Sequence, residues 1–154
     1  MKNSIIIFIL CAILGSCESS VKKETEANEE KEELTIEGNW ELVSFYNYQD
    51  NQVVDSFKTN EGYRQVKMYQ NDKVMWSKLV PLDSTDWFGY GNYTASNDTL
   101  IEVLEYGSKI MNQVIAEKKQ FVHKLILEKD RFIQIELDED GNYVYSENYR
   151  RIAN

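Results

Sequence analysis

Short runs in which apolar and polar residues alternate fill most of the chain after Ile36. The alternation is clear in Val66-Lys67-Met68, from Val122 to Leu127 and from Phe132 to Leu137. Because successive side chains of a strand point to opposite faces, each run predicts a β-strand with one buried and one solvated face. The predicted strands cover residues 37–48, 52–58, 63–70, 73–80, 87–95, 99–106, 118–128, 131–138 and 142–152.

Turn-forming residues separate these runs. Asp50-Asn51, Asn71-Asp72, Asn97-Asp98, Lys129-Asp130 and Asp140-Gly141-Asn142 recur between them. Asparagine, aspartate and glycine tolerate a positive φ or bond their own backbone, so they favour tight turns. Neighbouring strands are therefore expected to be antiparallel.

The sequence predicts an all-β domain over residues 36–154, a length that supports one core but hardly two. All ten tyrosines and all three tryptophans fall in this region, and such residues are enriched in strands. A meander of eight or nine short strands closes into a barrel because closure removes its exposed edges. A two-sheet sandwich is the alternative. Residues 108–116 carry apolar residues at helical spacing and predict one short helix that covers an end of the sheet.

The amino-terminal residues resemble an export signal. Lys2 precedes an apolar run from Ile5 to Leu14, which leads into Gly15-Ser16-Cys17. Ten residues in a helix span about 15 Å, whereas a bilayer core is about 30 Å thick, so a transmembrane anchor is disfavoured. We expect residues 1–16 to be a lipoprotein signal peptide and Cys17 to become the lipidated residue. An ordinary cleaved secretory signal is the alternative.

Residues 17–35 are predicted to be an acidic, flexible tether. Between Glu18 and Glu37 the chain has eight glutamates, three lysines and almost no large apolar side chain, so it cannot bury enough surface to fold. A helix is the alternative. We expect an exported protein held by lipid on a bacterial membrane, most simply the outer membrane, on its periplasmic or surface face. The net charge of −9 disfavours nucleic acid as a partner.

Few residues offer chemistry. The two cysteines, Cys11 and Cys17, lie in or next to the signal, so the domain has no thiol for a disulfide, a metal site or nucleophilic attack. The single histidine, His123, has no partner visible in sequence and is expected to face the surface or the pore. The acidic run from Asp138 to Asn142 resembles part of a calcium loop, but a hairpin turn explains it better. We therefore expect no enzyme activity, no metal and no cofactor.

Two terminal motifs resemble those of lipocalins and the wider calycin group. Gly38-Asn39-Trp40 resembles their Gly-x-Trp motif, and the segment from Glu147 through Tyr149 to Arg151 resembles the closing Glu-x-aromatic-x-Arg of small bacterial lipocalin-like proteins. The resemblance implies that Arg151, or Arg150 if the register slips by one, packs over the indole of Trp40. A guanidinium over an indole contributes about 0.5–2 kcal/mol.

A third motif, within Trp87–Tyr93, is similar to the Gly-x-Gly-x-Tyr strand of the same bacterial proteins. Its glycines, Gly89 and Gly91, are expected at a bend or bulge beneath an aromatic neighbour. The resemblance covers residues 36–152 and implies a barrel with a ligand cup. It names no ligand, because functions in this family are largely unassigned.

Aromatic residues are the remaining functional signal. Filling the barrel is their default role, but aromatic residues that face a cavity also suit a small apolar or amphiphilic ligand. The candidate ligand-binding residues are Tyr46, Tyr69, Trp76, Phe88 and Tyr90. The alternative function is a protein-interaction or inhibitor module with a filled barrel, and a carbohydrate-active enzyme with two buried carboxylates is a third. Asp83-Ser84-Thr85 and Asp98-Thr99-Leu100 also resemble bacterial O-glycosylation signals. The sequence predicts no oligomeric state.

Overall fold

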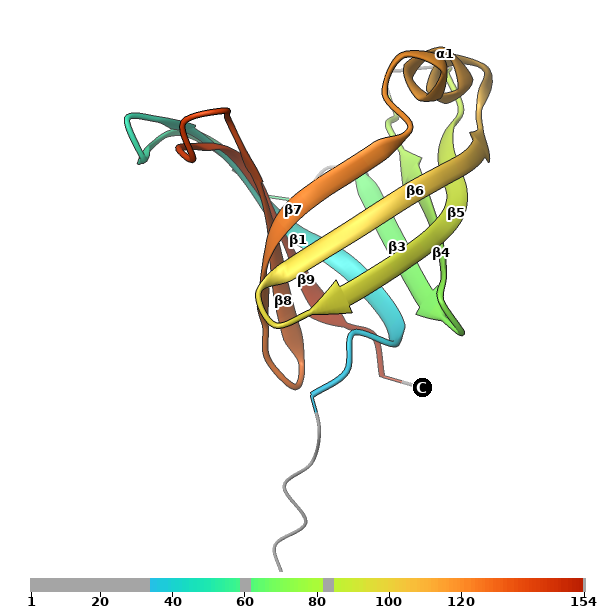
Figure 1. Ribbon diagram of the computed structural model, residues 1–154, viewed down its shortest axis with the longest axis horizontal. Helices are drawn as coiled ribbons and strands as arrows, with labels where there is room; N and C mark the ends of the chain where they lie inside the picture. Colours follow the sequence, from blue (N-terminus) through green and yellow to red (C-terminus); the bar gives the residue numbers. More distant parts are fainter. Residues whose placement is uncertain (1–33, 59–61, 82–84, 154) are drawn as a thin grey trace, which may run out of the picture. The chain divides into compact units, whose positions relative to one another are not determined.

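The computed structural model describes residues 34–58, 62–81 and 85–153. The predicted signal, Cys17 and most of the tether lie outside these residues, as do Asp83 and Ser84. The described part holds nine strands and one helix (Figure 1). The elements are β1 (Gly38–Gln49), β2 (Gln52–Lys58), β3 (Arg64–Gln70), β4 (Lys73–Leu79), β5 (Trp87–Ser96), β6 (Thr99–Gly107), α1 (Lys109–Glu117), β7 (Gln120–Leu127), β8 (Arg131–Leu137) and β9 (Tyr143–Arg151).

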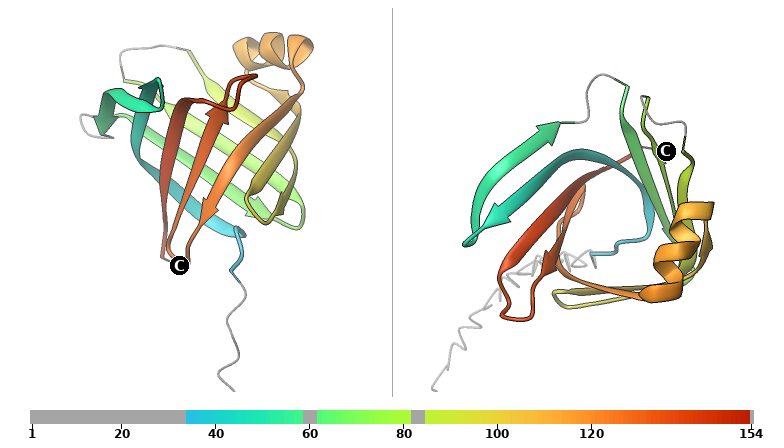
Figure 2. Two further views of the ribbon diagram at one scale, coloured as in Figure 1. Left: turned by 60° about the vertical axis from the view of Figure 1, so that its left-hand side comes forward. Right: turned by 90° about the horizontal axis from the view of Figure 1, so that it is seen from above.

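Strand β1 closes the sheet because both of its edges are paired. Its first four residues pair with β3, its second half pairs with β2, and β9 runs along its other edge. Every pairing is antiparallel, and β3 to β9 follow one another in chain order. Eight strands thus form a closed barrel, and the β1–β2 hairpin diverges from β3 on one side of the ring (Figure 2). The predicted barrel is confirmed, and the sandwich alternative is wrong.

The predicted turn residues supply the backbone conformations that the hairpins need. Asp50 and Asn51, which link β1 to β2, and Asn71 and Asp72, which link β3 to β4, all have φ between 49° and 61°. Two consecutive positive φ values define a turn whose twist matches that of the flanking strands. Between β8 and β9, the Asp138 carboxylate accepts backbone hydrogen bonds within its own turn. The acidic run is therefore a hairpin turn.

Glycines permit a close approach between strands at the middle of the barrel wall. A side chain on Gly91 would place its Cβ 2.1 Å from the Val103 carbonyl oxygen of β6, and one on Gly89 would meet the Trp76 ring at 2.8 Å. The register between β5 and β6 also shifts between Tyr90 and Gly91. The bulge and the aromatic neighbour that were predicted for this motif are both present.

One end of the barrel is filled by an aromatic core. Trp40 is fully buried, and its ring and that of Phe132 form a T-shaped pair with centroids 4.8 Å apart. Phe132 stacks on Tyr149 at 4.6 Å, and Tyr69 and Phe132 form a second T-shaped pair. Because β1 starts here and β9 ends here, the chain enters and leaves the barrel at this closed end (Figure 1).

Helix α1 lies at the opposite end of the barrel (Figure 1). Ser108 caps its first turn by accepting a hydrogen bond from the Met111 backbone N–H. The helix packs on β5 and β6, and Met111 is its buried residue. In residues 34–58, 62–81 and 85–153, no helix has the length and hydrophobicity needed to cross a membrane. The predicted short helix is confirmed one residue later than expected.

Candidate functional site

A cavity of about 260 Å³ occupies the barrel between helix α1 and the closed end. Its apolar lining comes from β4, β5, β6, α1 and β7. Its polar lining comes from β3, β4, β6, β7, β8 and β9. The lining residues are Gln65, Lys67, Trp76, Lys78, Trp87, Glu102, Leu104, Met111, Val114, Phe121, His123, Gln134, Tyr145 and Glu147.

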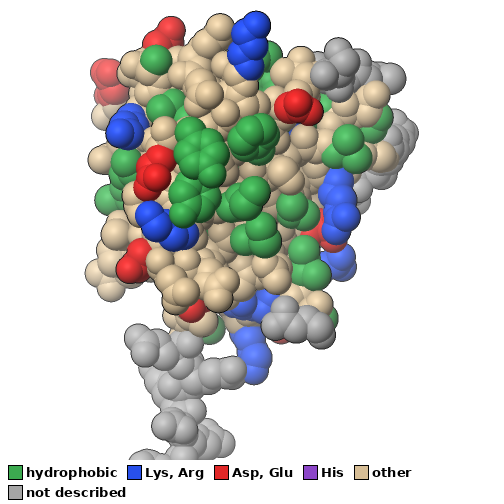
Figure 3. Space-filling model, turned by 90° about the vertical axis from the view of Figure 1, so that its right-hand side faces the viewer, with side chains coloured by type: hydrophobic (Ala, Val, Ile, Leu, Met, Phe, Trp, Pro, Cys, Tyr) green, Lys and Arg blue, Asp and Glu red, His purple; other side chains and the backbone are tan. Residues whose placement is uncertain are grey.

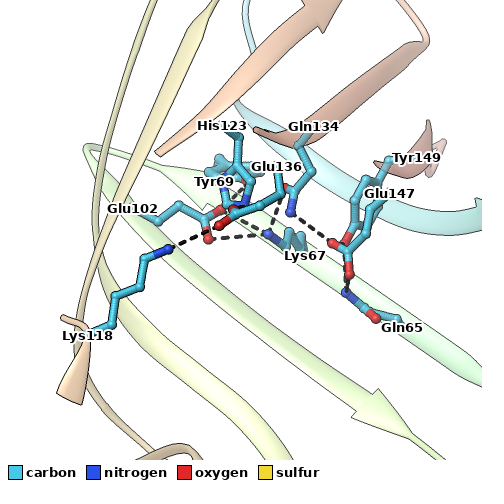
Figure 4. Close-up of polar contacts among 10 residues, drawn as sticks. All are labelled: Gln65, Lys67, Tyr69, Glu102, Lys118, His123, Gln134, Glu136, Glu147 and Tyr149. Carbon is cyan, nitrogen blue, oxygen red and sulfur yellow. Dashed lines mark hydrogen bonds and ion pairs between the residues drawn. The ribbon is translucent and has the colours of Figure 1, made fainter. Parts of the chain in front are cut away.

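A buried ion pair forms the centre of the polar part (Figure 4). Lys67 and Glu102 are each only 3% exposed, and the Lys67 Nζ lies 3.0 Å and 3.3 Å from the two Glu102 carboxylate oxygens. Lys67 also donates to the Gln134 side-chain oxygen at 2.8 Å, and the Tyr69 hydroxyl donates to Glu102 at 2.5 Å. Burial would raise the pKa of Glu102, but the Lys67 charge and these hydrogen bonds outweigh it and lower that pKa. Glu102 is therefore ionised at neutral pH.

Glu147 is the second carboxylate of the cavity. It accepts hydrogen bonds from the side chains of Gln65 at 3.2 Å, Gln134 at 2.9 Å and Tyr149 at 2.6 Å. All three donors are neutral. Burial and then the charge of Glu147 raise the pKa of Tyr149 and of Tyr145 above the usual tyrosine value. The field of this carboxylate thus reaches the surrounding hydroxyls.

His123 lies beside this network and is 3% exposed. Its Nε2 atom is 3.4 Å from a Glu136 oxygen, and the other Glu136 oxygen binds Lys118 at 3.1 Å. Its Nδ1 atom has no hydrogen-bond partner among the described residues. Burial and the Lys67 charge lower the pKa of His123 against the opposing carboxylates, so the imidazole is neutral at pH 7. Of the two expected positions, His123 takes the one facing the pore.

The five residues predicted to bind ligand are not brought together. Trp76 lines the cavity, whereas Tyr69 lies below it with its hydroxyl on Glu102. Tyr90 pairs across strands with the exposed residues Met75 and Tyr106, so it lies on the outer face. Phe88 and Tyr46 are not among the cavity-lining residues. Ligand binding by any of the five stays a prediction, and Trp76 is the one in position for it.

The two terminal motifs meet at the closed end. The Arg151 guanidinium carbon lies 4.0 Å from the centre of the Trp40 ring, and the two residues are cross-strand partners. Gly38 has φ +126°, and a Cβ there would lie 2.6 Å from an Arg151 nitrogen, which explains the glycine of the motif. The Tyr149 ring belongs to the core and its hydroxyl reaches Glu147. Tyr149 and Glu147 thus connect the closing motif to the polar part of the cavity, called the cavity floor below.

Sequence reasoning missed the buried ion pair. The available signal was Glu102 itself, a lone charge between Leu100 and Leu104, which both point into the core. A polar residue at a core position of a period-two run needs a buried partner. Lys67 gave a weaker signal, since it alternates with Val66 and Met68. The distance along the chain between Lys67 and Glu102 hid their pairing.

The outer face of β3 to β6 carries an apolar patch, in which hydrophobic side chains gather at the centre of the view (Figure 3). Cross-strand pairs connect Met68 to Met75, Met75 to Tyr90 and Tyr90 to Tyr106. The hypothesis of an interaction module required such a patch together with a filled barrel. The patch is present, but the barrel holds a cavity.

A glycosidase needs a carboxyl with a raised pKa as its general acid, whereas the pKa of Glu102 is lowered. Within the described ranges, no group of three or more His, Cys, Asp or Glu side chains is placed to hold a metal ion. The polar groups of the cavity instead form a fixed set of hydrogen bonds and charges, which suits recognition of a polar head group.

Comparisons with known proteins agree with the architecture. No protein-family model and no curated protein matches the sequence. A crystal structure of a lipocalin-like protein from Bacteroides uniformis superposes with a TM-score of 0.54 at 14% identity, over 75% of this chain and 97% of that one. An uncharacterized protein from Bacteroides eggerthii gives a TM-score of 0.47, also at 14% identity, over 75% and 98%. The match to the Bacteroides uniformis structure shows that the barrel of this chain has the lipocalin-like fold.

Proposed function

We propose that the protein is a membrane-anchored lipoprotein whose barrel binds a small amphiphilic molecule. The observation that carries the proposal is the cavity beneath α1, which is apolar on one part of its wall and hydrogen-bonding on the other. Ligand pockets combine a mostly apolar lining with a few placed polar groups. At about 260 Å³ the cavity is slightly below the usual range for drug-sized ligands, so the ligand is small.

The two parts of the cavity define how such a ligand lies. Trp76, Met111 and Phe121 belong to the apolar part, and burying carbon against them contributes about 25 cal/mol per Å². Gln65 and Glu147 belong to the polar part, where the side chains already hold one another in place. Such a prearranged floor binds a polar group without ordering new side chains. The apolar body of the ligand therefore lies toward α1 and its head toward β9.

Blocking the cavity should abolish ligand retention. Val114→Trp places an indole at the α1 wall of the cavity, and Val144→Trp is its control, because Val144 is similarly exposed (42% against 36%) but does not line the cavity. The measurement is native mass spectrometry of the full chain purified from its own cells. We expect an added small mass on the wild type and on Val144→Trp but not on Val114→Trp. Repeatedly empty wild-type protein that also takes up no added aromatic amphiphile would contradict binding.

Membrane attachment rests on the sequence alone, namely the apolar run from Ile5 to Leu14 followed by Gly15-Ser16-Cys17. Several acyl chains on one residue anchor a protein almost irreversibly, since each buried methylene contributes about 0.8 kcal/mol. We expect Cys17→Ser to abolish labelling by radioactive palmitate and to move the protein from the membrane fraction to the soluble fraction. Cys11→Ser is the matched control and should keep both properties. Unchanged labelling of Cys17→Ser would exclude lipidation at this residue.

A further inference from the structure

We propose that the ligand carries a protonated amine as its head group and that this amine pairs with Glu147. The inference rests on the proposed ligand-binding function and narrows its chemical class. The proposal excludes ligands with a carboxylate head group, such as fatty acids, although the aromatic composition alone would allow them.

Glu147 has a charge that the described residues leave unneutralised. Its three hydrogen-bond donors, Gln65, Gln134 and Tyr149, are neutral side chains. In the described part of the chain it forms no ion pair with a lysine or arginine, whereas Glu102 and Glu136 each have one. Glu147 is also less buried than Glu102 and lines the cavity. A cation entering the cavity would find a partly exposed carboxylate without a counter-charge.

Two lysines line the cavity. Lys78 lies over the Trp87 ring, and Lys67 is engaged in the buried pair. The ammonium group of Lys67 has three N–H donors, and they are directed to the two Glu102 oxygens and to Gln134. An added carboxylate would have to break this buried pair, and it would lie near Glu147, whose charge adds to burial in raising the pKa of Tyr145 and Tyr149. Like charges brought together in a buried site disfavour the charged form of either group.

The aromatic wall adds a second attraction for cations. Trp76, Trp87, Phe121 and Tyr145 line the cavity, and the negative face of such rings attracts an ammonium group. The Trp87 ring already has the Lys78 ammonium 5.5 Å from its centre, and the Phe121 ring has that of Lys118 at 5.4 Å. Among the described cavity residues, Trp76 and Tyr145 are therefore the rings left for a ligand cation. An arylalkyl amine places its ring against the apolar wall and its ammonium between the rings and Glu147.

The test uses four probes that share one phenyl ring and differ in the head group. Isothermal titration calorimetry on the full chain at pH 7 compares phenethylamine, 2-phenylethanol, phenylacetate and ethylbenzene. We expect phenethylamine to bind at least tenfold more tightly than phenylacetate and ethylbenzene, with the alcohol between. Equal binding of ethylbenzene and phenethylamine, or tighter binding of phenylacetate, overturns the amine proposal but leaves a ligand-binding barrel. Binding of none of the four overturns the proposed function for ligands of this size.

Two variants assign the effect to one carboxylate. Glu147→Gln keeps the size and the hydrogen-bonding capacity of the side chain but removes its charge, so we expect at least a tenfold loss of phenethylamine affinity and little change for 2-phenylethanol. Glu105→Gln removes a charge from the outer surface, where Glu105 pairs with Lys73, and should leave both affinities unchanged. Phenethylamine binding by Glu147→Gln within twofold of the wild type overturns the assignment. Since the head-group comparison uses wild-type protein, the proposal is tested even if Glu147→Gln does not fold.

Discussion

Replacing Lys67 by methionine is expected to destabilise the barrel by about 3–5 kcal/mol at pH 7, because it leaves Glu102 as a buried carboxylate without its counter-charge. The pKa of Glu102, which lies below its ordinary value in the wild type, should then rise above it. When folding raises the pKa of a carboxyl, the protein loses folding stability as the pH increases from the unfolded-state pKa through the raised value. Urea unfolding should therefore show a larger deficit at pH 7.5 than at pH 5.

Two controls separate the buried pair from an ordinary ion pair. Lys73→Met breaks the exposed pair of Lys73 with Glu105, whose atoms are 3.3 Å apart, and should cost less than about 1 kcal/mol. Lys67→Met combined with Glu102→Gln removes both charges and keeps an acceptor for the Tyr69 hydroxyl, so it should recover most of the loss. The account fails if Lys67→Met costs no more than Lys73→Met, or if its deficit does not depend on pH.

Replacing Trp40 by alanine is expected to cost about 3–5 kcal/mol of unfolding free energy, the range for removing a large buried aromatic side chain. Trp40 is fully buried, its ring forms a T-shaped pair with Phe132, and its indole N–H donates to the Ile36 carbonyl at 2.7 Å. Its removal also takes the ring from beneath the Arg151 guanidinium. Equilibrium urea unfolding, followed by far-UV circular dichroism, measures the loss.

Trp87 is the natural comparison for Trp40. It is a partly buried tryptophan at the cavity wall with Lys78 over its ring, so Trp87→Ala should cost clearly less than Trp40→Ala. Trp40→Phe keeps a ring but leaves the Ile36 carbonyl without its donor, and we expect an intermediate loss. Equal losses for the two alanine variants would show that the closed end is not the main support of the barrel.

The strands and turns were predictable because local chemistry determines them. Asn71 and Asp72 accept the positive φ of a tight hairpin, and strand β3 was predicted one residue longer than observed, over residues 63–70 instead of 64–70. The closure of the barrel was predictable from the two terminal motifs, since Trp40 and Arg151 lie at the start of the first strand and the end of the last. These features depend on short segments and their order.

The sequence was a weaker guide to which face of a strand points inward. In β3 the usual interpretation buries Val66 and Met68 and exposes Lys67, but Met68 is 43% exposed and Lys67 is buried. The alternation shows that every second residue lies on the same face of the strand. It does not show which of the two faces points to the core when the interior holds a polar network. The same ambiguity affected the aromatic residues of β5, where Gly89 and Gly91 face inward and Tyr90 faces outward.

The cavity floor could not be predicted from sequence. It combines Lys67 of β3, Glu102 of β6, Gln134 of β8 and Glu147 of β9 (Figure 4). Neither Lys67 nor Gln134 belongs to a recognisable motif, and their contact depends on the strand order and on the stagger of the closed barrel. Glu147 was identified as part of the closing motif, but its place at the cavity became visible only in three dimensions.

The contacts of Arg151 bear on how the barrel withstands mechanical tension. This residue donates to the carbonyls of Thr35 and Glu37, just ahead of β1, and to that of Lys129 in the β7–β8 turn. A pull on the chain ahead of Leu34 would first load these hydrogen bonds and then β1 along its length, where β3 and β9 hold it on both sides. Strands loaded in shear share the force over many bonds. The load path therefore runs from the closed end along the strand that pairs with Glu147 of the cavity.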